Sequence, residues 1–147
     1  MTNNSEIGSE WKKWDLHVHT PKTFLNNQFN TVEVDGFIKK ILESNLSVIG
    51  LTNYFRFEGA ELTEIKPALE NKGIVVFPNV EFRIKPENKE NEDMHIHLIF
   101  SNEIKDMENT IKNFLARVKT FDDKYCSELT PEHIKKQVCH LIPYITL

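Results

Sequence analysis

Residues 46–77 read LSVIGLTNYFRFEGAELTEIKPALENKGIVVF, and the pattern of this segment is the strongest indication of the fold class. Its two ends, LSVIGLT and IVVF, are short and mostly apolar, which is typical of strands buried on both faces of a sheet. Between them, Leu62, Ile65 and Leu69 recur at helical spacing. Pro67 is expected in the first turn of that helix or at a kink, and Lys72-Gly73 is expected to end it. This order predicts two strands joined by a crossover helix.

The flanking segments continue the alternation of strands and helices. WDLHVH at 14–19 alternates apolar and polar side chains, as a strand does, and a helix is predicted within 33–45 with Asn45 as its stop. Pro78-Asn79 is expected to separate the strand at 74–77 from another at 80–84. The remaining predicted elements are a strand at 94–100, an amphipathic helix from Ile104 to Val118, and a helix opened by Thr130-Pro131. We therefore expect an α/β fold in which parallel strands form a sheet or barrel, the helices lie outside, and ligands bind at the carboxyl ends of the strands.

The bulk composition restricts the class of protein. The 147 residues are 39% hydrophobic and 27% charged, which is ordinary for one soluble domain. The net charge of -4 argues against a surface built mainly to grip phosphate backbones, although a local basic patch leaves nucleic acid open as a substrate. Residues 1–10 are expected to be a flexible lead-in without signal-peptide character, and no apolar run approaches the roughly 20 residues that span a bilayer. With only two cysteines, a cytoplasmic protein without membrane contact is expected.

Polar side chains that can ligate metal lie near several predicted strand ends. His17 and His19 are two residues apart on a strand, so both imidazoles can face one ion. Asn53 follows the second strand, Glu81 follows the Pro-Asn break, and His97 stands in an apolar strand where an unpartnered imidazole is costly. Each residue alone also has an explanation without metal: His17 and His19 as polar strand histidines, Glu81 in a surface salt bridge, and His97 as a hydrogen-bonded core histidine. Together, the histidines and Glu81 favour a shell for Mn, Zn or Fe, with Asn53 as a weaker oxygen ligand.

Three further residues near these positions have two readings each. His95 shares a strand face with His97 and is expected to be solvent-facing or to support a ligand rather than to bind metal itself. Arg56 and Arg83 lie just beyond the second and third ligand positions, where a phosphate could approach. Arginine suits bidentate phosphate contact, but a surface salt bridge fits both residues equally well.

The aromatic residues and cysteines carry weaker signals. Phe55 and Phe57 could stack on a base, although a core role is the commoner one for such residues. No close zinc spacing links the remaining cysteines and histidines, so reduced thiols and helix-surface imidazoles are expected at Cys126, His133, Cys139 and His140.

Four segments resemble, in order, the motifs of the PHP (polymerase and histidinol phosphatase) superfamily. WDLHVHTP resembles the first motif, and IGLTNYF resembles the second, which usually ends Thr-Asp-His. VVFPNVEFRI resembles the third, with its glutamate at Glu81, and HIHLIF resembles the following strand, with His97 at the histidine. The sequences of these four segments are most similar to those of TrlF-like proteins, in which a PHP domain precedes an SMC-like ATPase domain. The resemblance covers most of Trp11 to Ser101.

This resemblance implies a distorted (β/α)7 barrel with up to three metal ions at its carboxyl-terminal rim. It implies phosphoester hydrolysis by a metal-activated water, with catalytic roles for His17, His19 and Glu81, of which Glu81 bridges two ions, and His97 as a further ligand. DNA or RNA is the implied substrate class, in DNA repair or phage defence, with an ATPase domain as partner. The chain departs from the pattern at Asn53-Tyr54, where many members have Asp-His, and this weakens one metal position.

The chain is shorter than such a barrel, and the superfamily's downstream histidine and Asp-x-His ligands have no counterpart in it. We therefore expect residues 11–147 to be an incomplete PHP-like domain, truncated at its carboxyl-terminal end. The leading hypothesis is a metal-dependent phosphoesterase. The alternatives are a truncated or degenerate fragment without activity, and a nucleic-acid-binding regulatory module for a partner ATPase.

Overall fold

The computed structural model describes residues 11–21, 23, 33–56, 59, 61–84 and 94–119. As far as the described residues extend, the strands and helices occur in the predicted order, except that the strands predicted at 74–77 and 80–84 form a single strand. The lead-in expected at 1–10 and the helix expected after Thr130 lie outside the described residues. In chain order the elements are β1 (Trp14–His19), α1 (Val34–Glu43), β2 (Val48–Tyr54), a π-helical turn η1 (Glu61–Ile65), α2 (Lys66–Glu70), β3 (Val75–Ile84), β4 (Met94–Ile99) and α3 (Met107–Leu115).

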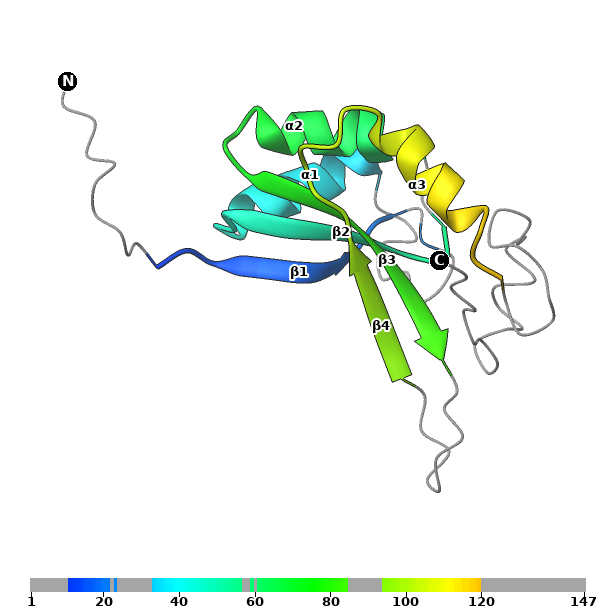
Figure 1. Cartoon of the computed structure of the whole chain (residues 1–147). Coiled ribbons are helices and arrows are strands. Elements are labelled where there is room, and N and C mark those ends of the chain that lie inside the picture. The colour runs from blue at the N-terminus through cyan, green and yellow to red at the C-terminus, as the bar shows by residue number, and fades with distance from the viewer. Residues whose placement is uncertain are drawn as a thin grey trace.

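The four strands form one curled sheet in the order β1-β2-β3-β4 (Figure 1). β1 pairs with β2, and β2 with β3, in parallel, whereas β3 and β4 are antiparallel. The prediction of parallel strands throughout is therefore wrong for β4. Only residues 85–93 separate β3 from β4, and a parallel crossover needs a dozen or more residues. The result is an α/β fold with a mixed parallel and antiparallel sheet, which curls as part of an α/β barrel does.

The helices cover one face of this sheet. α1 and α2 each follow one parallel strand and precede its neighbour, so the common handedness of such crossovers places both on the same face, where α3 also lies (Figure 1). Side chains at alternate positions of β3 enter the core there, including Val76, Val80 and Phe82, all of which are buried. The alternation sends Asn79 and Glu81 to the opposite face. We call this opposite face the histidine face.

The residues that the sequence predicts at the ends of the helices lie there in the structure. Asn45 adopts φ 56 just after α1, and Gly73 adopts φ 82 after α2, as expected of residues that close helices in the left-handed region. Pro67 lies in the first turn of α2.

The predicted break at Pro78-Asn79 is wrong, because β3 runs unbroken through both residues. Pro78 is tolerated because β4 pairs with β3 only from Asn79 onward, so its nitrogen needs no partner on that side. Its carbonyl still accepts from the backbone nitrogen of Phe100 at 2.9 Å.

Within the described residues, every helix falls short of the length and apolar character needed to cross a membrane.

Candidate metal centre

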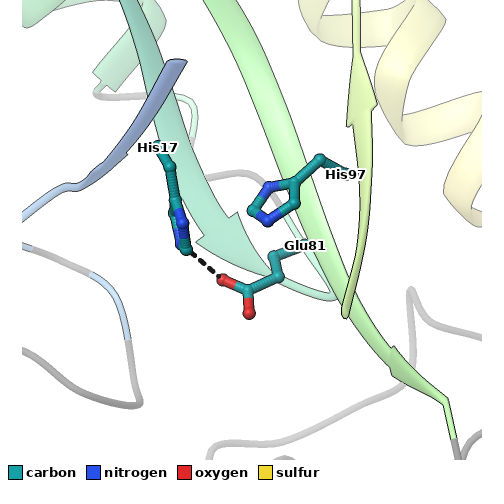
Figure 2. A group of neighbouring side chains, drawn as sticks. All are labelled: His17, Glu81 and His97. Atoms are coloured by element: carbon teal, nitrogen blue, oxygen red, sulfur yellow. Dashed lines mark hydrogen bonds and ion pairs between the residues drawn. The ribbon is translucent and has the colours of Figure 1, made fainter. Parts of the chain in front are cut away.

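Side chains from three strands meet on the histidine face. β1 supplies His17, β3 supplies Glu81, and β4 supplies His97, which lies directly opposite Glu81 in the antiparallel register. One ligand atom from each of these residues lies within 4.8 Å of the other two (Figure 2). We call these three residues the His17–Glu81–His97 group.

His19 lies against this group. Its Nε2 is 3.0 Å from Nε2 of His17 and 3.3 Å from Oε2 of Glu81. Its other side stacks on the ring of Tyr54, with centroids 4.8 Å apart and an interplanar angle of 20°. The structure therefore brings three of the predicted ligands together and places the fourth beside two of them.

The spacing within the group suits a divalent cation. Nε2 of His17 lies 3.0 Å from Oε2 of Glu81. Two donors that each lie about 2.1 Å from one ion, at right angles, are about 3.0 Å apart. An ion can therefore take a place between these two atoms with little movement of either side chain.

Glu81 carries the central negative charge of the group. Its side chain is 0% exposed. Burial raises its pKa, but the hydrogen bond with His19 and the charges of His17 and His19 outweigh burial and lower the pKa to about 2. Among the described residues its ion pairs are all with histidines. A buried, ionised carboxylate in this setting is well suited to a metal cation.

Asn79 orients the ring of His97. The amide nitrogen of Asn79 donates to the carbonyl oxygen of Leu16 at 2.8 Å and to Oγ1 of Thr52 at 2.9 Å, which uses both of its hydrogens. Nδ1 of His97 lies 3.0 Å from that nitrogen and 3.3 Å from Oδ1 of Asn79, so Nδ1 donates to the oxygen. This tautomer leaves Nε2 with a lone pair for a metal. Burial also lowers the pKa of His97, which favours the neutral ring that a metal requires.

A bulge in β1 sets the position of His17. The pairing of β1 with β2 shifts register within 15–18, so that Leu16 and His17 both lie opposite Gly50. A Cβ on Gly50 would lie 2.2 Å from the carbonyl oxygen of Leu16, so only glycine permits this approach. The same carbonyl accepts the amide of Asn79 across the sheet. The bulge, the glycine and the asparagine thus connect His17 to the strand that carries Glu81.

Asn53, predicted as a weak metal ligand, lies on the helix face of the sheet. It pairs in register with Val80, a core residue. Oγ1 of Thr20 donates to Oδ1 of Asn53 at 2.9 Å, and Nδ2 of Asn53 donates to the buried carboxylate of Glu61. The structure therefore does not bring Asn53 to the His17–Glu81–His97 group.

The structure also shows two residues, Asn79 and Glu61, whose roles the sequence reasoning missed. Asn79 is expected from the sequence only as part of a break, although its position two residues before Glu81 on a strand gives it the same face. His95, by contrast, was predicted to be solvent-facing or to support a ligand, and its Nδ1 does lie 2.7 Å from Oε1 of Glu81. Glu61 has no sequence signal of burial, because an acidic residue in a first helical turn is usually exposed.

The structure gives less information about Arg56 and Arg83, the two residues predicted to contact phosphate. Arg56 is half-buried just after β2. The backbone of Arg83 pairs with that of His95, one step beyond the pair formed by Glu81 and His97, and its side chain lies outside the described part of the chain.

Of the two phenylalanines and the cysteine and remaining histidine residues singled out in the sequence, the structure describes only Phe55. Phe55 is buried and meets Phe82 edge-on, with ring centroids 5.7 Å apart, which assigns it to the core. Its φ of 59 is strained for a phenylalanine. Residues Phe57, Cys126, His133, Cys139 and His140 lie outside the described ranges.

Comparisons with known proteins do not identify the chain. A scan against models of protein families matches none of them, and a search of curated proteins returns no match. The site itself indicates a chemistry, because a buried carboxylate with imidazole nitrogens from two other strands can hold a divalent metal ion.

Proposed function

We propose that this chain is a metal-dependent phosphoesterase domain of the PHP type, with nucleic acid as its substrate class. The observation that supports this most is the buried, ionised carboxylate of Glu81 among histidines from β1 and β4. The curled α/β sheet is consistent with part of a barrel. Mixed imidazole and carboxylate donors suit Mn, Zn or Fe, and these are the proposed metals.

The residues of the site have different proposed roles. His17, Glu81 and His97 hold the ion, and His19 supports Glu81 from beside it. A bound divalent ion supplies Lewis-acid polarisation of a phosphoryl oxygen and a water of lowered pKa. Asn79 fixes the ring of His97. Glu81 stays ionised at neutral pH and so keeps its affinity for a cation.

Metal binding is tested first, by calorimetric titration of Mn²⁺ into the chelator-treated chain. We expect at least one ion to bind, and Glu81→Gln and His17→Ala to abolish it. Bound metal should also stabilise the wild-type fold, by about 2.7 kcal/mol at 100 times the dissociation constant. Glu43→Gln is the matched control, because Glu43 is an exposed glutamate on α1 whose substitution changes the charge by the same amount. Wild-type affinity in Glu81→Gln would refute the site.

Hydrolysis is tested separately, with bis(p-nitrophenyl) phosphate and single-stranded DNA as substrates. We expect Mn²⁺-dependent cleavage in the wild type and in Glu43→Gln, and none in His17→Ala or Glu81→Gln. Metal binding without cleavage of either substrate would refute the phosphoesterase. It would favour the inactive fragment or the binding module, which a DNA-binding assay on the same samples separates.

A further inference from the structure

A buried glutamate lies against the helix face of the sheet, outside the His17–Glu81–His97 group. Glu61 begins the π-helical turn η1, and its carboxyl group contacts the side chains of Thr20 and Asn53. We propose that Glu61 is a neutral carboxylic acid, and that its ring of three hydrogen bonds with Thr20 and Asn53 positions the end of β1 beside the metal centre. We call these three residues the Glu61 ring.

Each member of the Glu61 ring contacts the other two. Oγ1 of Thr20 lies 2.9 Å from Oδ1 of Asn53. The same Oγ1 contacts Oε1 of Glu61, and Nδ2 of Asn53 contacts Oε2 of Glu61. Thr20 and Glu61 are 0% exposed and Asn53 is 2% exposed, so bulk water cannot replace any of these contacts.

The number of hydrogens in the ring identifies the state of Glu61. Three contacts need three hydrogens, of which the hydroxyl of Thr20 supplies one and the amide of Asn53 a second. An ionised Glu61 supplies none, so two oxygens would face each other without a hydrogen between them. Reversing the amide of Asn53 leaves the total unchanged, because its oxygen would then face Glu61. A protonated Glu61 closes the ring: it donates to Thr20, Thr20 donates to Asn53, and Asn53 donates to the second oxygen of Glu61.

Burial acts in the same direction, because the removal of a carboxylate from water disfavours its charged form. Among the described residues of the neighbouring helices, Lys66 on α2 and Lys112 on α3 each pair with a glutamate four residues away in the same helix. Arg56 is half-buried just after β2. An ion pair between Arg56 and Glu61 would keep Glu61 ionised, and the experiment distinguishes that state from the neutral acid.

The Glu61 ring joins two strands next to residues that support the metal centre. Thr20 directly follows His19, and Asn53 directly precedes Tyr54. His19 stacks on Tyr54 and lies 3.3 Å from Oε2 of Glu81. The ring therefore fastens β1 to β2 at the step where the stacked rings lie beside Glu81, which makes Glu61 a positioning residue. This positioning role rests on the proposed function, whereas the neutral state of Glu61 does not.

The neutral state is tested by carbon-13 NMR of the metal-free full chain at neutral pH, because the chemical shift of a carboxyl carbon differs between its protonated and ionised forms. The signal of Glu61 is identified by its loss in Glu61→Gln. We expect the shift of a protonated acid in the wild type. The shift of an ionised carboxylate would overturn the inference and would favour an ion pair instead.

The positioning role is tested by urea unfolding and Mn²⁺ titration of matched variants. Glu61→Gln supplies the third hydrogen through its amide, so it should keep the urea midpoint and the Mn²⁺ affinity of the wild type. Thr20→Val removes the hydroxyl at the centre of the ring and should lower Mn²⁺ affinity at least about tenfold, whereas Thr20→Ser keeps the hydroxyl and should keep the affinity. Glu64→Gln is the control for charge, because Glu64 is an exposed glutamate on the same turn.

Three results would count against the inference. A urea midpoint of Glu61→Gln well below that of Glu64→Gln would show that the wild type needs the ionised form. Wild-type Mn²⁺ affinity in Thr20→Val would overturn the positioning role, even if that variant were less stable. Absence of Mn²⁺ binding in the wild type would remove the proposed function and the positioning role together, while the carbon-13 signal would still decide the state of Glu61.

Discussion

Replacing Gly50 with alanine should damage both the fold and the metal site. The new Cβ would lie 2.2 Å from the carbonyl oxygen of Leu16. An ordinary contact between carbon and oxygen is about 3.3 Å or longer, so β1 and β2 must separate locally by roughly 1 Å. Forced separations of this kind cost about 1–3 kcal/mol, and loss of the hydrogen bond from Asn79 to Leu16 adds about 1 kcal/mol. We expect Gly50→Ala to lower the free energy of unfolding by about 2–4 kcal/mol.

The same shift should weaken metal binding, because His17 follows Leu16 in the bulge. Metal sites tolerate ligand displacements of only about 0.2 Å, so an ångström-scale movement should lower Mn²⁺ affinity at least about tenfold. The assay is urea unfolding of the metal-free chain, followed by calorimetric titration of Mn²⁺ into the folded variant.

Gly73→Ala is the matched control. Gly73 has φ 82, and no atom lies within 4 Å of the place that a Cβ would occupy, so alanine there strains the backbone by about 1–2 kcal/mol without touching the site. It should lose stability and keep wild-type Mn²⁺ affinity. The reasoning fails if Gly50→Ala unfolds within about 0.5 kcal/mol of the wild type, or if it binds Mn²⁺ as tightly as Gly73→Ala.

Three further predictions concern pH, the support of His97 and the role of Asn53. The folded chain holds the pKa of His97 below its ordinary 6.5, so the unfolded state takes up the proton first. The contribution of His97 to the stability of the metal-free chain should therefore be fully present above pH 6.5 and decline below it. Urea unfolding midpoints should depend less on pH in His97→Gln than in the wild type. The same pH dependence in both proteins would contradict the lowered pKa of His97. Asn79→Ala should lower Mn²⁺ affinity about 10–100-fold, because the ring of His97 loses its orienting partner, and full affinity would refute that role. Asn53→Ala should cost about 1–3 kcal/mol of stability on thermal or urea unfolding but leave Mn²⁺ stoichiometry unchanged, whereas loss of an ion would restore Asn53 as a ligand.

Much of the fold follows from local sequence. The bounds of β1 match the alternating run WDLHVH, and Asn45 and Gly73 end helices where their types predict. The direction of β4 and the continuity of β3 were not predicted. Both depend on which strand lies alongside, since Pro78 is acceptable only where β4 has already ended. The short connection at 85–93 was the available signal for the antiparallel pair.

The grouping of His17, Glu81 and His97 was predictable from the sequence, whereas most of the residues that support them were not. Histidine and glutamate types, with a spacing of two on β1, indicated His17 and Glu81 without any structure. The face on which Asn53 lies could not be predicted locally, because it depends on the register of β2 against β3, which places Asn53 beside Val80. The partners of Glu81 depend in the same way on β4, which is how His95 came to face Oε1.

The distance along the chain between the ligands has a consequence for the order of assembly. His17 and Glu81 are 64 residues apart. Bringing such distant positions together in an unfolded polypeptide is entropically unfavourable, so an ion that meets the unfolded chain finds at most a local histidine pair, without Glu81. Capture must wait until β1, β2 and β3 have paired. A bound ion would thus secure a topology that has already formed rather than nucleate it, and its supply would govern the lifetime of the native state more than the speed of folding.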